Sequence, residues 1–246
     1  MAEQLGQDWE DLAELDLYWS ILSDPHKQFG RWQVGDFLRS GETEVDRLAE
    51  RMDLLGVPSS RGRALDFGSG AGRVTRALAR HFEEAVGVDV SRRMVDTARE
   101  LNSDVANCTF FVNRSEDLAN FKTGTFDLIY TANVLHHLPS QANILAALSE
   151  LARLLAPGGL LAFQVATFIP PSHRLQPRRR IYSGLRKAGV SPTFIYRRLR
   201  LHPMRMTSVS HEAVVRHLTS IRVRVLEDDR VRSEAGSESA TYYCTK

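Results

Sequence analysis

The chain has 246 residues, of which 43% are hydrophobic and 25% are charged, proportions that fit one α/β domain with additional segments. No run reaches the roughly 18 apolar residues of a membrane-spanning helix, so we expect no membrane partner, and the first residues do not resemble a signal peptide, so we expect a cytoplasmic protein. Only Cys108 and Cys244 occur, and no Cys/His pair has the spacing of a metal site, which predicts buried thiols and no bound metal.

The net charge of +2 conceals an asymmetry between the two parts of the chain. Residues 151–246 contain 17 lysines and arginines and 6 acids, a net charge of +11, which leaves −9 for residues 1–150. No acidic residue occurs between Glu150 and Glu212. This pattern predicts either a cationic lip beside the functional site or an electrostatic attraction between the two parts.

Helical patterns precede the first strand. Residues 8–22 place apolar side chains at three- and four-residue intervals, which is the stripe of an amphipathic helix, and a loop with a short helix follows over 30–37. A second long helix is expected over 42–55, where Gly56 ends it. We therefore predict a helical cap over residues 1–60 and a further domain over residues 61–246.

From residue 63 onward, short apolar runs alternate with helical patterns. Strands are expected at residues 63–66, 85–89, 108–112, 126–130 and 160–165, and helices near 72–81, 91–101, 133–138 and 141–155. Such alternation indicates a parallel sheet with helices on both faces.

The C-terminal part departs from this rhythm. A helix is expected near 210–218, followed by strands at 221–225 and 240–244 that form an antiparallel hairpin at the sheet edge. Residues 170–206 carry several prolines and ten lysines and arginines. We interpret them as a basic insertion with one or two short helices, placed where it can act as a lid.

The stretch Arg63–Val74 is the feature around which the sequence is organised. A short apolar run ends at Asp66, and Gly68, Gly70 and Gly72 follow at every second position before a helical pattern resumes. Glycines at this spacing allow positive φ and a close approach of the backbone to a ligand at a helix N-terminus. The order is D-x-G-x-G-x-G and not the G-x-G-x-x-G of dinucleotide sites. Asp66 disfavours an anion there and tolerates an ammonium or sulfonium centre.

This stretch resembles motif I of the class I S-adenosylmethionine (SAM) dependent methyltransferases, and three more segments extend the resemblance over residues 63–165. Asp89 ends the second predicted strand, where a carboxylate can accept hydrogen bonds from ribose hydroxyls, as in the family. Residues 126–138 resemble motif IV, and residues 151–161 resemble the family's helix–Pro-Gly-Gly–strand turn. The resemblance implies an α/β, Rossmann-like, seven-stranded and mostly parallel sheet with an antiparallel C-terminal hairpin, and SAM as the cofactor.

The resemblance also implies a set of cofactor-binding residues. They are Asp66, Gly68, Ser69, Gly70, Gly72, Asp89, Val90, Met94, Ser115, Glu116 and Thr131. Met94 would pack on adenine, and the carbonyl near Thr131 would face the amino group of the methionine moiety. Asn113-Arg114 replaces the Gly-Asp that the family often has in its adenine-binding loop. The contact then falls to the backbone of Ser115 and to the side chain of Glu116 or Asn113.

His136 and His137 stand at the end of the motif IV segment, which the family places beside the transferable methyl group. An imidazole there can accept a proton from a hydroxyl or amine nucleophile, since its pKa lies near working pH. A structural role, in which the rings hold the loop by hydrogen bonds, stays open. As the base we place His136 ahead of His137, because the family counterpart of His136 is variable and points at the substrate.

The resemblance implies a methyltransferase, and we expect a small-molecule acceptor that is methylated at an oxygen. Trp32, Phe37 and His136 are the candidates for contact with the acceptor. The basic insertion suits an anionic acceptor or a solvated surface, and nucleic acid is not expected because no nucleic-acid-binding module accompanies it. Two alternatives stay open, an RNA or protein methyltransferase that docks through residues 170–206, and a SAM-binding protein without catalysis. Homo-oligomerisation is also open.

Overall fold

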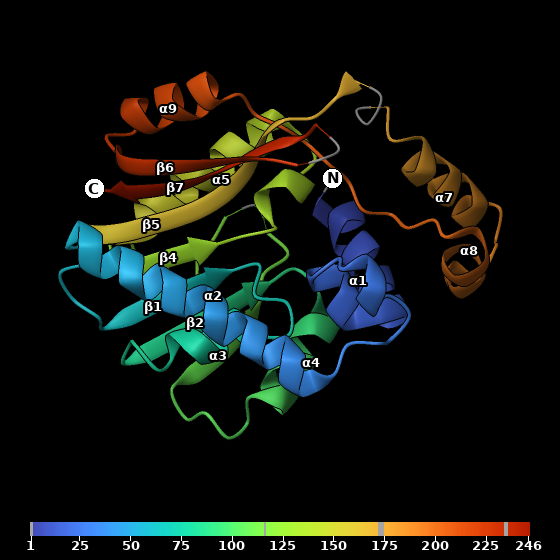
Figure 1. Ribbon diagram of the computed structural model, residues 1–246, viewed down its shortest axis with the longest axis horizontal. Coiled ribbons are helices and arrows are strands. Elements are labelled where there is room, and N and C mark those ends of the chain that lie inside the picture. The colour runs from blue at the N-terminus through green and yellow to red at the C-terminus, as the bar shows by residue number, and fades with distance from the viewer. Residues whose placement is uncertain (1, 116, 172–174, 234–235) are drawn as a thin grey trace.

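A single seven-stranded sheet runs through the computed structural model, which describes residues 2–115, 117–171, 175–233 and 236–246 (Figure 1). The strand order is β3-β2-β1-β4-β5-β7-β6. The strands are β1 (Arg63–Phe67), β2 (Glu84–Asp89), β3 (Cys108–Val112), β4 (Phe126–Thr131), β5 (Leu155–Phe168), β6 (Arg224–Arg232) and β7 (Glu238–Thr245). The predicted fold class is therefore confirmed.

The direction of the strands sets where a ligand site can form. Strands β1 to β5 pair in parallel, whereas β7 pairs antiparallel with both β5 and β6. The chain runs outward from β1 to β3 and then returns to place β4 on the other side of β1. In open α/β sheets ligands bind at such a switch point, outside the carboxyl ends of the strands.

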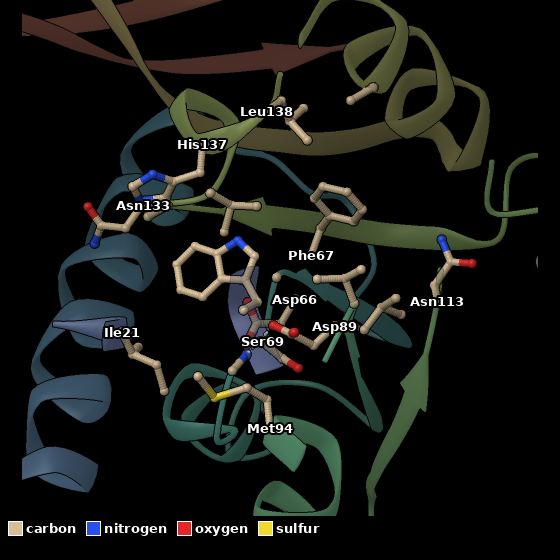
Figure 2. Close-up of a pocket in the computed structure, with 18 of the residues that line it drawn as sticks. Ile21, Asp66, Phe67, Ser69, Asp89, Met94, Asn113, Asn133, His137 and Leu138 are labelled. Carbon is tan, nitrogen blue, oxygen red and sulfur yellow. Dashed lines mark hydrogen bonds between the residues drawn. The ribbon is translucent and has the colours of Figure 1, made fainter. Parts of the chain in front are cut away.

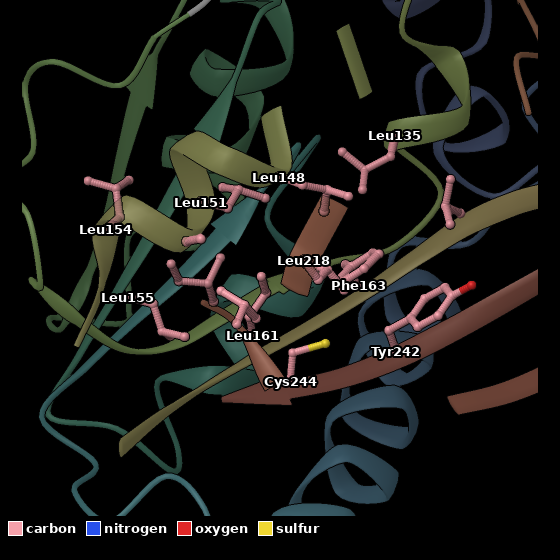
Figure 3. Packing of buried hydrophobic residues seen from close by; sticks show 14 of the residues in the cluster. Leu135, Leu148, Leu151, Leu154, Leu155, Leu161, Phe163, Leu218, Tyr242 and Cys244 are labelled. Carbon is pink, nitrogen blue, oxygen red and sulfur yellow. The ribbon is translucent and has the colours of Figure 1, made fainter. Parts of the chain in front are cut away.

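Helices cover both faces of the sheet. On one face α2 (Val34–Leu55) and α3 (Arg73–Leu78) bury Leu48 and Leu78 against Leu128 and Ala162. On the other face α5 (Gln141–Leu154) and α9 (His211–Ser220) pack against Leu161 and its neighbours, and Figure 3 shows this cluster reaching β7. Successive β5 residues thus point to opposite faces, both of them buried, as expected for a strand covered on both sides. Helix α4 (Arg92–Leu101) packs on β3.

Three helices lie outside this core, namely α1 (Ala2–Ile21), α7 (Pro177–Lys187) and α8 (Pro192–Leu199). Figure 1 shows them together at one end of the molecule, away from α9. Helix α1 is kinked at Asp16, whose buried carboxylate accepts hydrogen bonds from the Phe29 and Gly30 amides and, at 3.0 Å, from the Tyr196 hydroxyl. This carboxylate joins α1, the following loop and α8.

Ion pairs join the acidic N-terminal part of the chain to the basic insertion. Arg179 of α7 lies 3.0 Å from the Asp8 carboxylate of α1, and Arg186 lies 3.2 Å from Asp11. The Tyr182 hydroxyl also donates to Asp11 at 3.2 Å. The acidic N-terminal part and the basic insertion therefore attract each other, which is one of the two expectations from the sequence.

Several boundaries differ from the sequence prediction. The expected short helix at 30–37 and the helix at 42–55 are one helix, α2, because no proline interrupts residues 34–55 and the helix accommodates Gly35 and Gly41. The expected helix at 133–138 is a single 3₁₀ turn, η2 (Leu135–His137), and another such turn, η1 (Pro25–Lys27), follows α1. The strand expected at 221–225 begins at Arg224, because Arg222 takes a left-handed φ of 60° in the turn after α9.

Cys244 is buried and Cys108 is half-buried, and both are free thiols. Among the described residues no cluster of metal-ligating side chains suits a metal ion. No described helix is long and apolar enough to cross a membrane.

Candidate cofactor and acceptor pocket

A pocket opens at the switch point of the sheet (Figure 2). Its floor comes from the carboxyl ends of β1, β2 and β4 and from the loop after β3, through Phe67, Asp89, Ala132 and Asn113. Helix α1 covers the opposite side with Leu5, Trp9 and Ile21. Figure 2 shows His137 and Leu138 across the pocket from Ser69 and Met94. The pocket thus combines the predicted motif residues with an N-terminal cover.

The glycine loop has the backbone that its spacing predicts. Gly68, Gly70 and Gly72 have φ values of 81°, 53° and 81°, a region that L side chains rarely adopt. A Cβ on Gly68 would lie 2.2 Å from Val134, and one on Gly70 would lie 2.7 Å from Ile21. Gly68 and Gly70 line the pocket, whereas Gly72 faces away from it and begins α3. The missing side chains therefore allow η2 and α1 to close on the loop.

Asp89 organises the loop from the end of β2. Its carboxylate oxygens accept hydrogen bonds from the Gly70 amide and from the Ser91 amide, both at 2.9 Å. Burial raises the pKa of Asp89, and these amide hydrogen bonds oppose the shift. Each oxygen keeps a further lone pair for a hydroxyl donor in the pocket. The position suits the diol of a ribose.

Asp66 lies at the end of β1 and is 4% exposed. Its carboxylate accepts a hydrogen bond from the Thr75 hydroxyl at 2.7 Å. Burial raises the pKa of Asp66 to about 7, against the lowering effects of Thr75 and of the nearby Arg73 guanidinium. The carboxyl group therefore changes charge near neutral pH, and a cation bound beside it would favour the ionised form.

A charged network that the sequence analysis missed lines the same end of the pocket. The Arg73 guanidinium lies 2.8 Å from one carboxylate oxygen of Glu44, and the Tyr130 hydroxyl donates to the other at 2.8 Å. Arg73 is 4% exposed, and among the described residues its Nε and the hydroxyl of the buried Ser69 have no hydrogen-bond partner. The one signal in the sequence was the position of Arg73, directly after the last glycine of the loop. Buried polar groups without partners suit a polar ligand.

The two histidines differ in their placement. His137 lines the pocket, whereas His136 does not, although the ring centroids are only 4.2 Å apart. His137 Nδ1 lies 2.6 Å from the Arg205 carbonyl oxygen, which can only accept, so Nδ1 carries the hydrogen and Nε2 of the neutral ring is an acceptor. Burial lowers the pKa of His137 to about 4 and that of His136 to about 3. Both rings are neutral at pH 7, and the pocket geometry favours His137 over His136, opposite to the predicted preference.

The predicted adenine side is partly in place. Val90, the buried Met94 and Ser115 line the pocket, while Glu116 lies outside the described residues. The Ser115 hydroxyl donates to the Asn113 side-chain oxygen at 2.8 Å, which fixes the loop after β3. Thr131 is fully buried and does not line the pocket, and its neighbours Tyr130 and Ala132 do so instead.

The two aromatic residues proposed for acceptor contact lie elsewhere. Phe37 is fully buried, 4.7 Å from the Tyr18 ring and 6.1 Å from the Trp32 ring. The Trp32 indole donates to the Leu22 carbonyl at 3.2 Å. Neither side chain lines the pocket, so the structure gives this prediction no support. The rings join α1 to α2 because burying aromatic surface stabilises that junction.

The residues present fit SAM in their chemistry. Asp89 offers acceptors for a ribose, Val90 and Met94 offer an apolar wall for a base, and Asp66 offers a carboxylate for a cation. The Arg73 Nε and the Ser69 hydroxyl, which have no hydrogen-bond partner among the described residues, supply buried donors for the polar end of an amino acid. An anionic dinucleotide would instead meet Glu44, Asp66 and Asp89.

Comparisons with known proteins agree with this assignment. Residues 65–163 match the family model "Methyltransferase domain". A ubiquinone biosynthesis O-methyltransferase of Xanthomonas oryzae pv. oryzae is 33% identical over 133 residues, 53% of this chain and 52% of that protein. The chain thus spans about half the length of the curated relatives it matches.

Two solved structures share the fold at low sequence identity. Magnesium protoporphyrin IX methyltransferase from Synechocystis PCC 6803, with bound SAH, has a TM-score of 0.58 and 20% identity, covering 89% of this chain and 90% of that one. The [4+2]-cyclase SpnF has a TM-score of 0.56 and 16% identity, covering 80% of each chain. These two show the fold alone. Together with the glycine loop and Asp89, the family match assigns residues 65–163 to the methyltransferase domain, and the pocket residues suit S-adenosylmethionine in their chemistry.

Proposed function

We propose that this protein transfers a methyl group from SAM to an oxygen of a small-molecule acceptor. The observation that carries the proposal is the placement of His137, a neutral imidazole with an accepting Nε2, in the same pocket as the glycine loop. The name of the Xanthomonas relative, an O-methyltransferase of ubiquinone biosynthesis, supports oxygen and a small acceptor.

The pocket residues divide into those for the cofactor and those for the acceptor. Asp89 would accept hydrogen bonds from the ribose hydroxyls, and Val90 and Met94 would flank the base. Asp66 would face the ammonium group and Arg73 the carboxylate of the amino-acid end. When bound, SAM supplies an electrophilic methyl group on a sulfonium. Leu5, Trp9, Leu138 and His137 remain for the acceptor.

His137 would act as the general base. Its Nε2 would take the proton of the acceptor hydroxyl, while Nδ1–H stays bonded to the Arg205 carbonyl. That carbonyl raises the pKa of His137 against the lowering effect of burial, and so stabilises the imidazolium as it forms. Helix α1 covers the pocket and excludes water from the reacting groups.

The pocket favours a small acceptor over a macromolecule. Much of its lining is apolar, and α1 leaves limited room for a polymer. The two cations that line it, Arg73 and Arg114, both lie beside acids, Glu44 and Glu10. The proposal therefore does not include an anionic acceptor.

The test is methyl transfer from SAM carrying a labelled methyl group to a panel of small phenols, amines and carboxylates, with mass spectrometry of the products. We expect methyl ethers from phenols, and loss of product but retained binding of S-adenosylhomocysteine (SAH) in His137→Gln. Label that enters only the amines, or only mixed RNA added as a separate acceptor, would show that the proposed acceptor is wrong. SAM binding without transfer to any acceptor would favour the non-catalytic alternative.

A further inference from the structure

The outer surface of α7 and α8 is unusual in combining exposed apolar side chains with cations. Ten large apolar side chains are exposed in the described chain, and six of them lie within residues 168–206. Ile181 of α7 and Phe194 of α8 are each 52% exposed. Folding alone does not require a half-exposed phenylalanine there, and clustered exposed apolar groups mark interaction sites.

Contacts with α1 determine which sides of the two helices face outward. Helix α7 turns Arg179, Tyr182 and Arg186 toward Asp8 and Asp11, and these three residues are spaced as one helix face. Helix α8 buries Ile195 and Tyr196, and Tyr196 contacts Asp16 and Trp19. The remaining sides of both helices face solvent.

On these outward sides each apolar residue is flanked by cations. Phe194, Arg197 and Arg198 follow the i, i+3, i+4 spacing of one face of α8, and all three are exposed. On α7 Ile181 lies between Arg178 on one side and Arg180 and Lys187 on the other. Among the described residues none of these five cations forms an ion pair, in contrast to Arg179 and Arg186.

The surrounding charge gives the surface a single sign. The sequence has no acid between Glu150 and Glu212, and the acids of α1 that lie near α7 are already paired on its inner side. Nucleic acid would be attracted by the cations but would make no use of Ile181, and an acidic protein would need an apolar pocket shaped to receive it. An anionic bilayer uses both, because basic side chains meet the headgroups while apolar ones enter the acyl boundary.

We propose that the outward sides of α7 and α8 form a docking surface for an anionic lipid bilayer, centred on Ile181 and Phe194 and flanked by Arg197 and Arg198. This is peripheral binding, so it is compatible with the absence of a spanning helix from the described residues. Both helices pack on α1, which covers the pocket, so docking would hold the pocket near the membrane surface (Figure 1). The proposal stands independently of methyl transfer.

Vesicle co-sedimentation of the full chain tests this proposal. We expect binding to phosphatidylcholine vesicles that contain phosphatidylglycerol and little binding to phosphatidylcholine alone. Arg197→Gln with Arg198→Gln should weaken binding roughly 30-fold, and Phe194→Ser about tenfold. The matched controls, Arg216→Gln with Arg222→Gln for charge and Leu54→Ser for an exposed apolar group, should bind like the wild type. Thermal unfolding should be unchanged in all of these variants.

Three outcomes would overturn the proposal. The first is no sedimentation of the wild type with phosphatidylglycerol vesicles at low salt. The second is equal weakening by the control variants, which would indicate a non-specific charge effect. The third is a Phe194→Ser variant whose affinity for these vesicles equals that of the wild type, and whose affinity for RNA in a parallel assay also equals that of the wild type. That result would indicate a surface for polyanions in general.

Discussion

The sheet with its loops and the helices that cover the pocket are held together in different ways. The glycine loop, Asp66 and Asp89 stand on buried strands, and their positions follow from backbone pairing between β1, β2 and β4. The cover, α1 with α7 and α8, is held by contacts between side chains, including ion pairs, ring contacts and the hydrogen bond between Asp16 and Tyr196. The glycine loop and the two acids therefore rest on a hydrogen-bonded sheet, while the position of the cover depends on contacts between replaceable side chains. Substitutions should distinguish the contribution of the sheet and its loops from that of the covering helices.

The largest effect is expected at His137. Replacing it with glutamine removes the proton acceptor, so kcat should fall by roughly 10²- to 10⁴-fold while SAH binding, measured calorimetrically, stays within about twofold. His136→Gln is the matched control, since its ring lies beside His137 but outside the pocket, and it should lose far less activity. Equal losses in both variants would mean that the pair acts structurally.

The pH profile gives the same assignment a second test. His137 must be neutral to accept a proton, and its pKa is lowered to about 4, so kcat should stay level as pH falls from 7 and decline only as pH approaches that value.

The lowered pKa values of the two histidines should also make the stability of the protein depend on pH. The unfolded chain takes up protons at His136 and His137 below the ordinary pKa of 6.5, and the folded chain does so at these two residues only near 4 or below. The free energy of unfolding should therefore decrease as the pH falls from 6.5 to about 4. The decrease should be smaller in the double variant His136→Gln/His137→Gln.

Asp89 should show the next largest effect, this time on the cofactor. Asp89→Ala removes a carboxylate that would accept the ribose hydroxyls and that holds the Gly70 amide, so the dissociation constant of SAH should rise about 100-fold. Asp104→Ala is the control, an exposed acid bonded to Arg76 outside the pocket. Unchanged SAH affinity in a folded Asp89→Ala protein would contradict the ribose assignment.

The core of the site was predictable because its residues lie close together in the sequence. A strand, a glycine loop and an acid at the next strand end form one βαβ unit, so the places of Asp66, Gly70 and Asp89 follow from local spacing. The parallel sheet with helices on both faces followed from the alternation of strands and helices, and the resemblance implied its seven strands. The adenine loop was less certain because Asn113-Arg114 departs from the family pattern.

The rest of the site could not be predicted because it depends on contacts between distant segments. Trp9 and Glu44 reach the pocket only through the packing of α1 and α2, and no local spacing indicates which face of those helices points inward. Trp32 and Phe37 illustrate the opposite error, since aromatic residues near a cap are buried in it as readily as they meet a ligand. The choice between His136 and His137 depended on the shape of one 3₁₀ turn.

Trp9 tests the cover and should show a moderate effect. Its ring lies edge-on to His137 at 5.2 Å and lines the pocket, so Trp9→Ala should raise KM for the acceptor about tenfold through the loss of apolar contact. SAH affinity should change less. Trp32→Ala is the matched control, a tryptophan at the junction of α1 and α2 that should lower the melting temperature without changing KM. A larger effect on SAH than on the acceptor would move Trp9 to the cofactor side.

The smallest effect is expected for the ion pair between α7 and α1. Arg186→Gln removes a partly exposed charge 3.2 Å from Asp11, and such pairs contribute less than about 1 kcal/mol. The Tyr182 hydroxyl still donates to Asp11, so chemical unfolding and acceptor KM should change little. Arg51→Gln is a fair comparison, since Arg51 pairs with Glu227 at similar exposure but far from the pocket. If Arg186→Gln changed KM as strongly as Trp9→Ala while Arg51→Gln did not, electrostatic attraction to α7 would have to control how closely α1 covers the pocket. Salt would then weaken acceptor binding in the wild type, because it screens exposed pairs far more than buried apolar contacts.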